Sequence, residues 1–315
     1  MKYALVFPGQ GSQAVGMGKI LAENFSEAQD VFREVDDTLS QKLSTLMFEG
    51  PLEDLTLTTN CQPALMAVSM AVFRVMTSLG VPLTVFSYAA GHSLGEYSAL
   101  AATGALTLAD TTRLLRTRGD AMQKAIPLGH GAMTAVIGAD DGALNNIVKD
   151  CSAFGVCEIA NDNAPGQVIL SGEKKALDQV SPLAEKYGVR KIIPLNVSAP
   201  FHCSLMKPAA LAMEEALNEV SINYPGIPIL PNVTARPETK PDILKSLLVM
   251  QITGRVRWRE TVLHMQEMGV THIIEAGSGK VLAGLIKRIT PDIQVQSVHT
   301  PEEIDNCIKT MERGI

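Results

Sequence analysis

Gly91-His92-Ser93-Leu94-Gly95 is the stretch around which the chain is organised. It follows residues 85–90, which predict a strand, and it precedes residues 94–102, which predict a helix. A serine between two glycines on a strand-to-helix turn is typical of a nucleophile elbow, although a plain glycine-flanked strand end gives the same letters. The turn is sharp, so only residues without a bulky side chain fit beside the serine. The serine hydroxyl would then lie near a helix N-terminus, whose free N–H groups favour developing negative charge.

A serine nucleophile needs a base, and the chain has six histidines. His202 follows a proline-bounded loop where the chain returns from an inserted unit, and loops at such junctions often line clefts. We therefore favour His202 as the base. His92 lies on the elbow itself, so a positional or packing role suits it better. A hydrolase triad also needs an acid between the serine and the histidine in the chain. Asp162 lies between them, but inside a predicted hairpin of the inserted unit. The sequence therefore favours a dyad of Ser93 and His202.

The composition is that of a globular protein in a reducing compartment. The 315 residues carry a net charge of −6, with 46% hydrophobic and 19% charged residues, which excludes a disordered or membrane chain. The start of the chain predicts a strand rather than a signal peptide, and no apolar run is long enough to cross a bilayer. The five scattered cysteines contain no metal-type pair and favour the cytoplasm. The mild acidity argues against a nucleic-acid partner.

The order of predicted elements divides the chain into two units. Residues 1–128 and 197–315 predict an α/β domain with a mostly parallel sheet, including a strand at residues 228–233. Residues 129–196 predict the order βαββαβ, which is typical of a ferredoxin-like unit. Because the α/β pattern resumes after residue 196, we expect the second unit to be a subdomain inserted into the first.

Two features have more than one interpretation at this stage. The loop around Gln10 is glycine-rich but has neither dinucleotide nor P-loop spacing, so it is either a ligand-contacting loop at a strand end or a plain tight turn. The helix predicted from about residue 107 to 125 carries Arg113, Arg116 and Arg118. Arginines on a helix usually form a solvated face, but one of the three could turn inward.

Seven short stretches, spread in order over essentially the whole chain, form a further pattern. They are Phe7-Pro8-Gly9-Gln10-Gly11-Ser12-Gln13, Gln62-Pro63-Ala64, Gly91-His92-Ser93-Leu94-Gly95-Glu96, Arg118-Gly119 with Met122-Gln123, Ser198-Ala199-Pro200-Phe201-His202, Pro231-Asn232-Val233-Thr234, and residues 277–282. Together they resemble the malonyl-CoA:acyl-carrier-protein transacylases, acyltransferases of fatty acid and polyketide synthesis. The resemblance implies a hydrolase-like α/β core with a ferredoxin-like insert. Ser278 departs from it, because the family usually has proline there, which leaves the geometry of that loop open.

The resemblance also implies roles for single residues. Ser93 would be the nucleophile and His202 its base, held by a main-chain carbonyl, which we assign to Gln251. Gln10 and Leu94 would supply backbone N–H groups to the oxyanion.

The remaining implied roles concern the acyl group. Arg118 would hold the free malonyl carboxylate in a two-pronged ion pair, for which a planar guanidinium is suited. Phe201 matches the form associated with malonyl rather than bulkier branched acyl groups. We count His92 among the substrate-binding residues for its place beside the serine.

The implied reaction moves malonyl from malonyl-CoA, through a serine ester, to the phosphopantetheine thiol of acyl carrier protein in fatty acid biosynthesis. The alternatives are a free-standing acyltransferase that serves a polyketide synthase, or a serine hydrolase or thioesterase on the same core. A catalytically silent binding module is disfavoured by the intact Ser93 and His202. We expect no cofactor or metal, and we expect a cytoplasmic monomer without nucleic-acid or membrane partners. The candidate contacts for an acidic carrier, chosen for charge alone, are Lys174, Lys175, Arg190, Lys191, Lys287 and Arg288.

Overall fold

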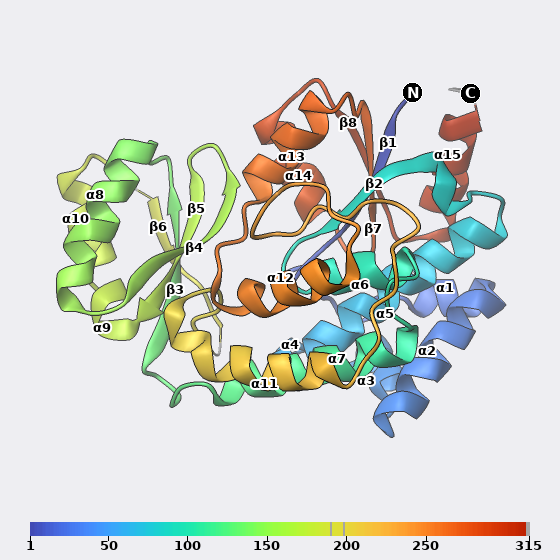
Figure 1. The fold of residues 1–315 in the computed structure, drawn as a ribbon, viewed down its shortest axis with the longest axis horizontal. Coiled ribbons are helices and arrows are strands. Elements are labelled where there is room, and N and C mark those ends of the chain that lie inside the picture. The colour runs from blue at the N-terminus through green and yellow to red at the C-terminus, as the bar shows by residue number, and fades with distance from the viewer. Residues whose placement is uncertain (190, 198, 313–315) are drawn as a thin grey trace.

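The computed structural model describes residues 1–189, 191–197 and 199–312, which form two separate sheets with helices around them (Figure 1). The first sheet has the strand order β2 (Phe86–Gly91), β1 (Tyr3–Phe7), β7 (His272–Ala276) and β8 (Gln294–Val298). Its neighbouring strands all run parallel. The predicted α/β fold with a mostly parallel sheet is therefore confirmed.

Helices cover both faces of this first sheet and fill the space below it in Figure 1. They are α1 (Lys19–Asn24), α2 (Ser26–Leu39), α3 (Leu43–Glu49), α4 (Leu52–Thr56), α5 (Thr58–Ser78), α6 (Gly95–Ala102), α7 (Leu108–Lys124), α11 (Lys207–Asn218), α12 (Pro241–Thr253), α13 (Trp258–Glu267), α14 (Val281–Ile289) and α15 (Pro301–Glu312). Short 3-10 helices are η1 (Leu83–Val85), η2 (Ser152–Phe154) and η3 (Ser204–Met206).

Strand β1 is buried on both faces, which explains its uninterrupted apolar sequence. Its side chains alternate, as the period of a strand requires. Leu5 and Phe7 enter the larger hydrophobic core with residues of α2, α5 and α7, whereas Ala4 and Val6 enter a smaller core with residues of α13 and α14. Burial of both faces fixes this strand in the middle of the molecule, so its carboxyl end and that of β2 provide a rigid base for the loops that follow them.

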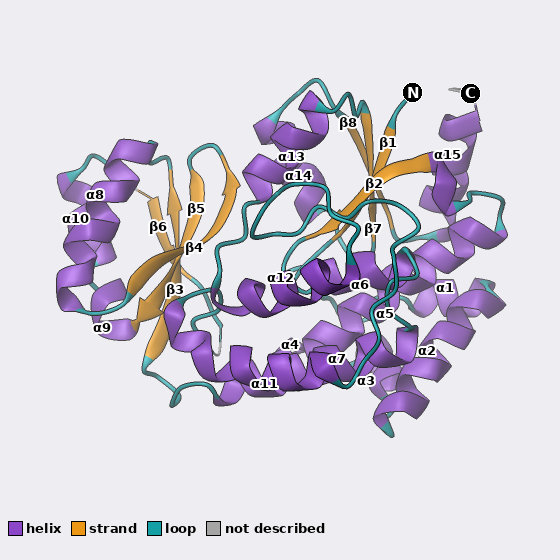
Figure 2. Ribbon diagram, viewed as in Figure 1, coloured by secondary structure: helices purple, strands orange, loops and turns teal. Residues whose placement is uncertain are grey.

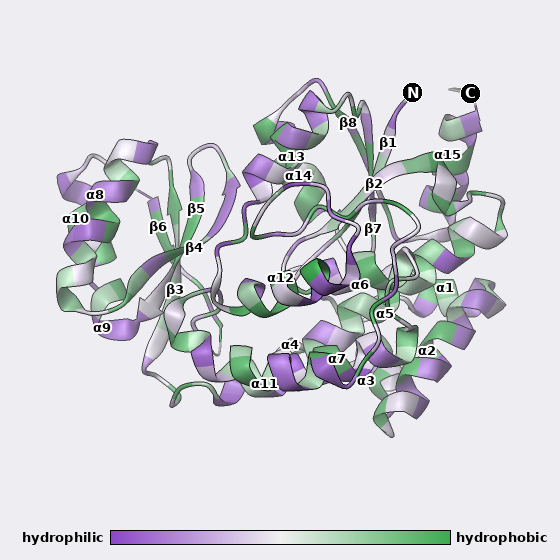
Figure 3. Cartoon of the chain, in the orientation of Figure 1, coloured by the Kyte–Doolittle hydropathy of each residue, from purple (hydrophilic) through white to green (hydrophobic). Residues whose placement is uncertain are grey.

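The second sheet is antiparallel and is built entirely from residues between Gly131 and Pro194 (Figure 2). Its strand order is β4 (Cys157–Ala164), β5 (Gln167–Glu173), β3 (Gly131–Ile137) and β6 (Lys191–Pro194), and its helices are α8 (Asp141–Cys151), α9 (Lys174–Leu177) and α10 (Val180–Lys186). The predicted order of elements and the hairpin between β4 and β5 are confirmed. Helices α8 and α10 show both hydrophilic and hydrophobic residues in Figure 3, because each buries one face against this sheet.

The edge strand β4 joins the two units. Asp162 N–H donates to the carbonyl of Val256 at 2.9 Å, and Val256 N–H donates to the carbonyl of Ala160 at 2.8 Å. The Asp162 carboxylate is fully buried and forms ion pairs with Arg255 and Arg259. This acid therefore links the second sheet to the first unit and does not orient a histidine.

The prediction of a strand at residues 228–233 is wrong. Only isolated bridges form there, from Ile229 to Ala89 and to Glu238. Pro228 and Pro231 lack the N–H groups that a continuous ladder needs, so the segment touches β2 at one point and then turns away.

Candidate active site

The turn after β2 is as tight as the spacing of its glycines predicts. A Cβ atom on Gly91 would lie 1.9 Å from the main chain of Gly95, and one on Gly95 would lie 2.3 Å from the carbonyl oxygen of Phe7. No side chain fits at either position. Ser93, between them, has a φ of 54°, a conformation that L-residues rarely adopt and that persists only when the surroundings impose it. The elbow is therefore built by close backbone contacts on both sides of the serine.

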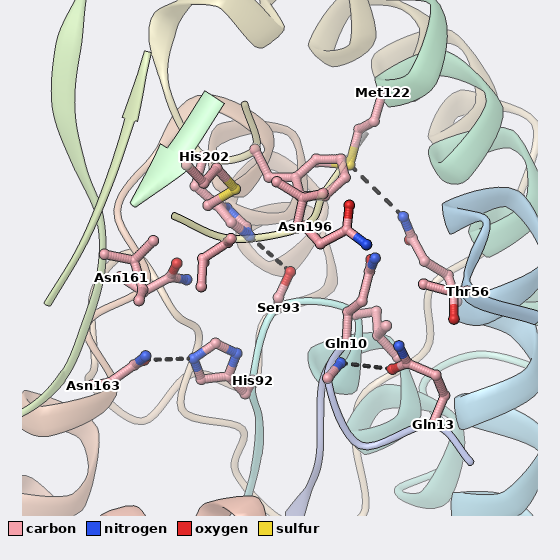
Figure 4. A pocket seen from close by; sticks show the side chains of 18 of the residues that line it. Gln10, Gln13, Thr56, His92, Ser93, Met122, Asn161, Asn163, Asn196 and His202 are labelled. Atoms are coloured by element: carbon pink, nitrogen blue, oxygen red, sulfur yellow. Dashed lines mark hydrogen bonds between the residues drawn. The ribbon is translucent and has the colours of Figure 1, made fainter. Parts of the chain in front are cut away.

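Ser93 and His202 meet although 109 residues separate them (Figure 4). The distance from Ser93 Oγ to His202 Nε2 is 2.7 Å, and His202 Nδ1 lies 2.9 Å from the carbonyl oxygen of Gln251. Since a carbonyl only accepts, Nδ1 carries the proton, and Nε2 is left to accept the serine proton. His202 also has a positive φ, 58°, so both members of the pair sit on strained backbone. A main-chain carbonyl occupies the place that an acid takes in a triad.

Burial keeps His202 neutral. The side chain is 3% exposed, and loss of solvation, with the nearby Arg118 cation second, lowers its pKa to about 3. A neutral imidazole at physiological pH is the form that can take a proton from Ser93. The pair is therefore poised as nucleophile and base.

Arg118 is the third member of this centre. It is 2% exposed, and its guanidinium donates to Gln62 Oε1 at 2.7 Å, Gln251 Oε1 at 2.9 Å and Ser93 Oγ at 3.1 Å. The ring of Tyr97 lies 5.7 Å from its central carbon. No ion pair to Arg118 occurs within the described ranges. A buried cation held only by neutral acceptors is prepared for an anionic ligand, because leaving its charge uncompensated is costly.

The structure settles which arginine of α7 turns inward. Arg118 follows the buried Leu115 by three residues and precedes the buried Met122 by four, so it lies on the buried stripe of the helix. Arg113 is 60% exposed and Arg116 is half-buried, because both lie off that stripe. The helical period around position 118 is the sequence signal that could have made this distinction.

A cavity of ≈ 340 Å³ opens over the serine, between the two units. Of the predicted substrate-binding residues, Gln251 does not line it, and the others do: Gln10, His92, Leu94, Arg118 and Phe201. Figure 4 shows Gln10 and His202 on opposite sides of Ser93. From the second sheet and the segment after it come Met133, Asn161, Asn163, Ile169, Leu195, Asn196 and Val197. Both units therefore shape the space that faces the Ser93 hydroxyl.

His92 does not reach the serine hydroxyl. Its Nε2 lies 2.8 Å from Asn163 Oδ1, and its ring packs against Trp258 with 5.8 Å between centroids. Burial lowers its pKa. His92 thus ties the elbow to β4 across the cavity floor, which agrees with a positional role.

Two polar side chains that received no role from the sequence support the centre, Asn232 at the elbow and Gln62 at Arg118. Asn232 Oδ1 accepts the Ser93 N–H at 2.7 Å, and Asn232 Nδ2 donates to the carbonyl of Gly91 at 2.6 Å. Gln62 orients Arg118 and in turn donates to Thr58 at 2.9 Å. Both residues belong to stretches that carried the family resemblance, and that was the available signal.

Ser278, which stands where the resembling family has proline, has a clear structural place. Its hydroxyl is buried and donates to the carbonyl of Ser12 at 2.7 Å. This bond fastens the loop after β7 to the Gln10 loop.

Within the described ranges, no group of three or more His, Cys, Asp or Glu could hold a metal ion. No described helix is long and apolar enough to cross a membrane. All five cysteines are buried and free.

The chain is similar along nearly its whole length to proteins of one family. The family model described as acyl transferase domain matches residues 4–298. The malonyl CoA-acyl carrier protein transacylase of Bacillus subtilis (strain 168) is 43% identical over 312 residues, covering 99% of this chain and 98% of the relative. A crystal structure of acyl-carrier-protein-S-malonyltransferase from Bartonella henselae is 51% identical, with a TM-score of 0.97 and coverage of 99% and 100%. A malonyl-transacylase in complex with its type II PKS acyl-carrier protein is 38% identical, with a TM-score of 0.95 and coverage of 98% and 100%.

Proposed function

This chain belongs to the acyl transferase family, and from that membership and the geometry of its site we propose that it transfers malonyl from malonyl-CoA to acyl carrier protein. The observation that carries the proposal is the position of Ser93 Oγ, 2.7 Å from His202 Nε2 and 3.1 Å from Arg118 Nη2. One side of the hydroxyl faces a base, and the other faces a cation suited to a carboxylate-bearing acyl group. The protein is an acyltransferase, and the serine ester is the intermediate that this geometry favours.

In the first half-reaction Ser93 Oγ attacks the thioester carbonyl carbon, and its proton passes to His202 Nε2. The carbon–sulfur bond breaks, the CoA sulfur takes the proton from His202, and the acyl group remains on Ser93 as an ester. In the second half-reaction the phosphopantetheine thiol of the carrier gives its proton to His202 and attacks the ester. Ser93 Oγ leaves and recovers the proton. Both exchanges are nearly balanced in energy, so the reaction needs no external drive.

The oxyanion that forms in each attack requires donors beside the carbonyl. We assign the backbone N–H groups of Gln10 and Leu94 to this role. The assignment is supported by the place of both residues in the cavity wall and by the N-terminus of α6, which begins directly after Leu94. Phe201 lies in the same wall next to His202, and we propose that its ring limits the room for branched acyl groups.

A second candidate differs only in the carrier. The malonyl-transacylase that binds a type II PKS carrier has a TM-score of 0.95 to this chain, so service to a polyketide synthase has a structural parallel. Transfer rates to a panel of fatty acid and polyketide carriers would separate the two. A hydrolase is disfavoured, because a carbonyl rather than an acid orients His202 and because Arg118 would have no ligand.

We further propose that residues 1–128 and 197–315 are a hydrolase-like core and that residues 129–196 are a ferredoxin-like subdomain. The elbow after β2 supports the first, and the strand order β4-β5-β3-β6 with its two helical connections supports the second.

A cytoplasmic location is supported by the five free cysteines. That the protein works as a monomer stays a prediction.

The proposal is tested by mass spectrometry of the intact protein after brief incubation with a mixture of malonyl-CoA, methylmalonyl-CoA and acetyl-CoA. The expected result is a malonyl adduct on the peptide that contains Ser93, in excess over both others. Protein that is denatured before mixing is the control for non-enzymatic acylation. A malonyl adduct on another residue contradicts the proposal. So does the absence of any adduct together with no transfer of malonyl to added carrier.

Docking of an acidic carrier should depend on salt, because exposed charges are screened. Of the candidate contacts, Lys174 and Lys175 already pair with Asp178 and Glu173, and Arg190 lies outside the described residues. Exposed Lys287 and Arg288 of α14, with the exposed Lys191, are therefore the better candidates.

We expect the KM for the carrier to rise severalfold between about 0.05 and 0.5 M salt, and Lys287→Glu to raise it further at low salt. Steady-state kinetics with holo carrier measures both. Lys19→Glu, an exposed lysine of α1, is the matched control and should change little. Equal effects of the two substitutions, or a KM that ignores salt, would remove α14 from the docking surface.

A further inference from the structure

Glu96 is a buried carboxylate that the reaction described above does not use. It lies on α6 three residues after Ser93 and is 1% exposed. Its Oε2 accepts two hydrogen bonds, from the side-chain Nε2 of Gln251 at 2.8 Å and from the backbone N–H of Asn232 at 2.9 Å. Burying a carboxylate costs free energy, so a buried carboxylate so near Ser93 needs a structural or functional explanation.

The bond from Gln251 to Glu96 is one of three contacts that fix which way the Gln251 side-chain amide faces. Gln251 Nε2 also donates to the carbonyl of Ser93 at 3.0 Å, while Gln251 Oε1 accepts from Arg118 Nη2 at 2.9 Å. If the amide were reversed, its oxygen would face the Glu96 carboxylate and the Ser93 carbonyl, and its N–H groups would face the guanidinium. An ionised carboxylate only accepts, so it excludes the reversed orientation.

We propose that Glu96 is a positioning residue: it fixes the Gln251 amide and thereby aims Arg118 at the acyl carboxylate. The inference rests on the proposed malonyl transfer, and it adds a residue that supports the selectivity of Arg118 for an acidic acyl chain. Glu96 touches no substrate atom in this role. It acts through the side-chain amide of Gln251, and the backbone carbonyl of the same residue holds His202.

The charges around Glu96 make this role sensitive to pH. Burial raises the pKa of Glu96 to about 7, against the opposing effect of its hydrogen bonds and of Arg118. Burial also raises the pKa of Tyr97, so it stays a neutral phenol, and the pKa of His202, lowered to about 3, keeps it neutral too. The pKa of His92 is lowered as well. Below about pH 7 Glu96 therefore takes up a proton and accepts a weaker hydrogen bond from Gln251. The preference for malonyl-CoA over acetyl-CoA should then fall as the pH is lowered.

The experiment compares wild type, Glu96→Ala and Glu96→Gln by the ratio of kcat/KM for Ser93 acylation from malonyl-CoA to that from acetyl-CoA, between pH 6 and 8.5. We expect Glu96→Ala to lower the ratio about 10- to 100-fold, the effect of losing one hydrogen bond to a charged group. Glu96→Gln keeps an acceptor for Gln251, so it should retain most of the selectivity. In Glu96→Gln the malonyl-to-acetyl ratio should stay constant between pH 6 and 8.5, whereas in wild type it should rise with pH.

Glu275→Gln is the matched control, because Glu275 is another buried carboxylate, held by Leu282 N–H, Ala283 N–H and Ser297 Oγ away from the cavity. It should leave the ratio and its pH dependence unchanged. A parallel fall of both rates in Glu96→Ala, or a pH dependence in Glu96→Gln equal to that of wild type, would overturn the inference. If Glu96→Ala does not fold, the comparison of wild type with Glu96→Gln decides alone. Failure of wild type to accept malonyl would instead refute the proposed function.

Discussion

Ser93→Ala is expected to abolish the acyl-enzyme. The hydroxyl faces a base, His202 Nε2, at 2.7 Å and accepts a hydrogen bond from the Arg118 cation at 3.1 Å. Removing the nucleophile of such a unit costs on the order of 10⁴-fold or more in turnover. Alanine keeps the backbone, including the Ser93 N–H bond to Asn232, so the fold should survive. Incubation with labelled malonyl-CoA followed by intact-protein mass spectrometry measures the outcome.

Ser98→Ala is the matched control for this substitution. Ser98 lies five residues further along, is buried on α6, and its hydroxyl has no hydrogen-bond partner within the described ranges. Its loss should leave both acylation and the melting temperature close to those of wild type. A labelled malonyl adduct that persists on Ser93→Ala would place the nucleophile elsewhere and remove the elbow from the chemistry.

Arg118→Ala is expected to remove the preference for malonyl. A buried charge that loses its ion-pair partner costs about 3–5 kcal/mol, so an incoming malonyl carboxylate without Arg118 should lose roughly 10²- to 10⁴-fold in kcat/KM. Acetyl-CoA has no carboxylate to leave unpaired, so its relative rate should rise. Arg118→Lys should fall between the two, because an ammonium cannot form the same two-pronged pair. Single-turnover acylation with both donors gives the ratio.

Arg113→Ala, on the solvent face of the same helix, is the control and should change neither rate. A melting temperature is needed for each variant, because removing Arg118 also leaves the side-chain oxygens of Gln62 and Gln251 without their donor. Selectivity that is unchanged in a folded Arg118→Ala variant would take this residue out of the carboxylate site.

The turns, the strands and the order of the elements could be predicted from the sequence because they depend on residues that are close together in the chain. The close approach of Gly91 and Gly95 is a property of one turn. The buried strand β1 follows from five consecutive apolar residues, and the order of elements between Gly131 and Pro194 follows from period and turn chemistry. The expected strand at residues 228–233 failed because two prolines interrupt its hydrogen bonding in a way that hydropathy does not record.

The sequence by itself determined the elbow and the order of its elements, and through the family resemblance it predicted the residues that we propose to react. Only the tertiary structure decided which groups control them. Glu96 and Asn232 are 136 residues apart, and the bond from Gln251 to Ser93 joins residues 158 apart. Such contacts exist only after both faces of the parallel sheet are packed, because a polar side chain finds its partner according to where the surrounding core leaves it buried. A pattern of neighbours along the chain does not contain that information, and for this reason the assignment of Arg118, Gln251 and Glu96 to one network had to come from the fold.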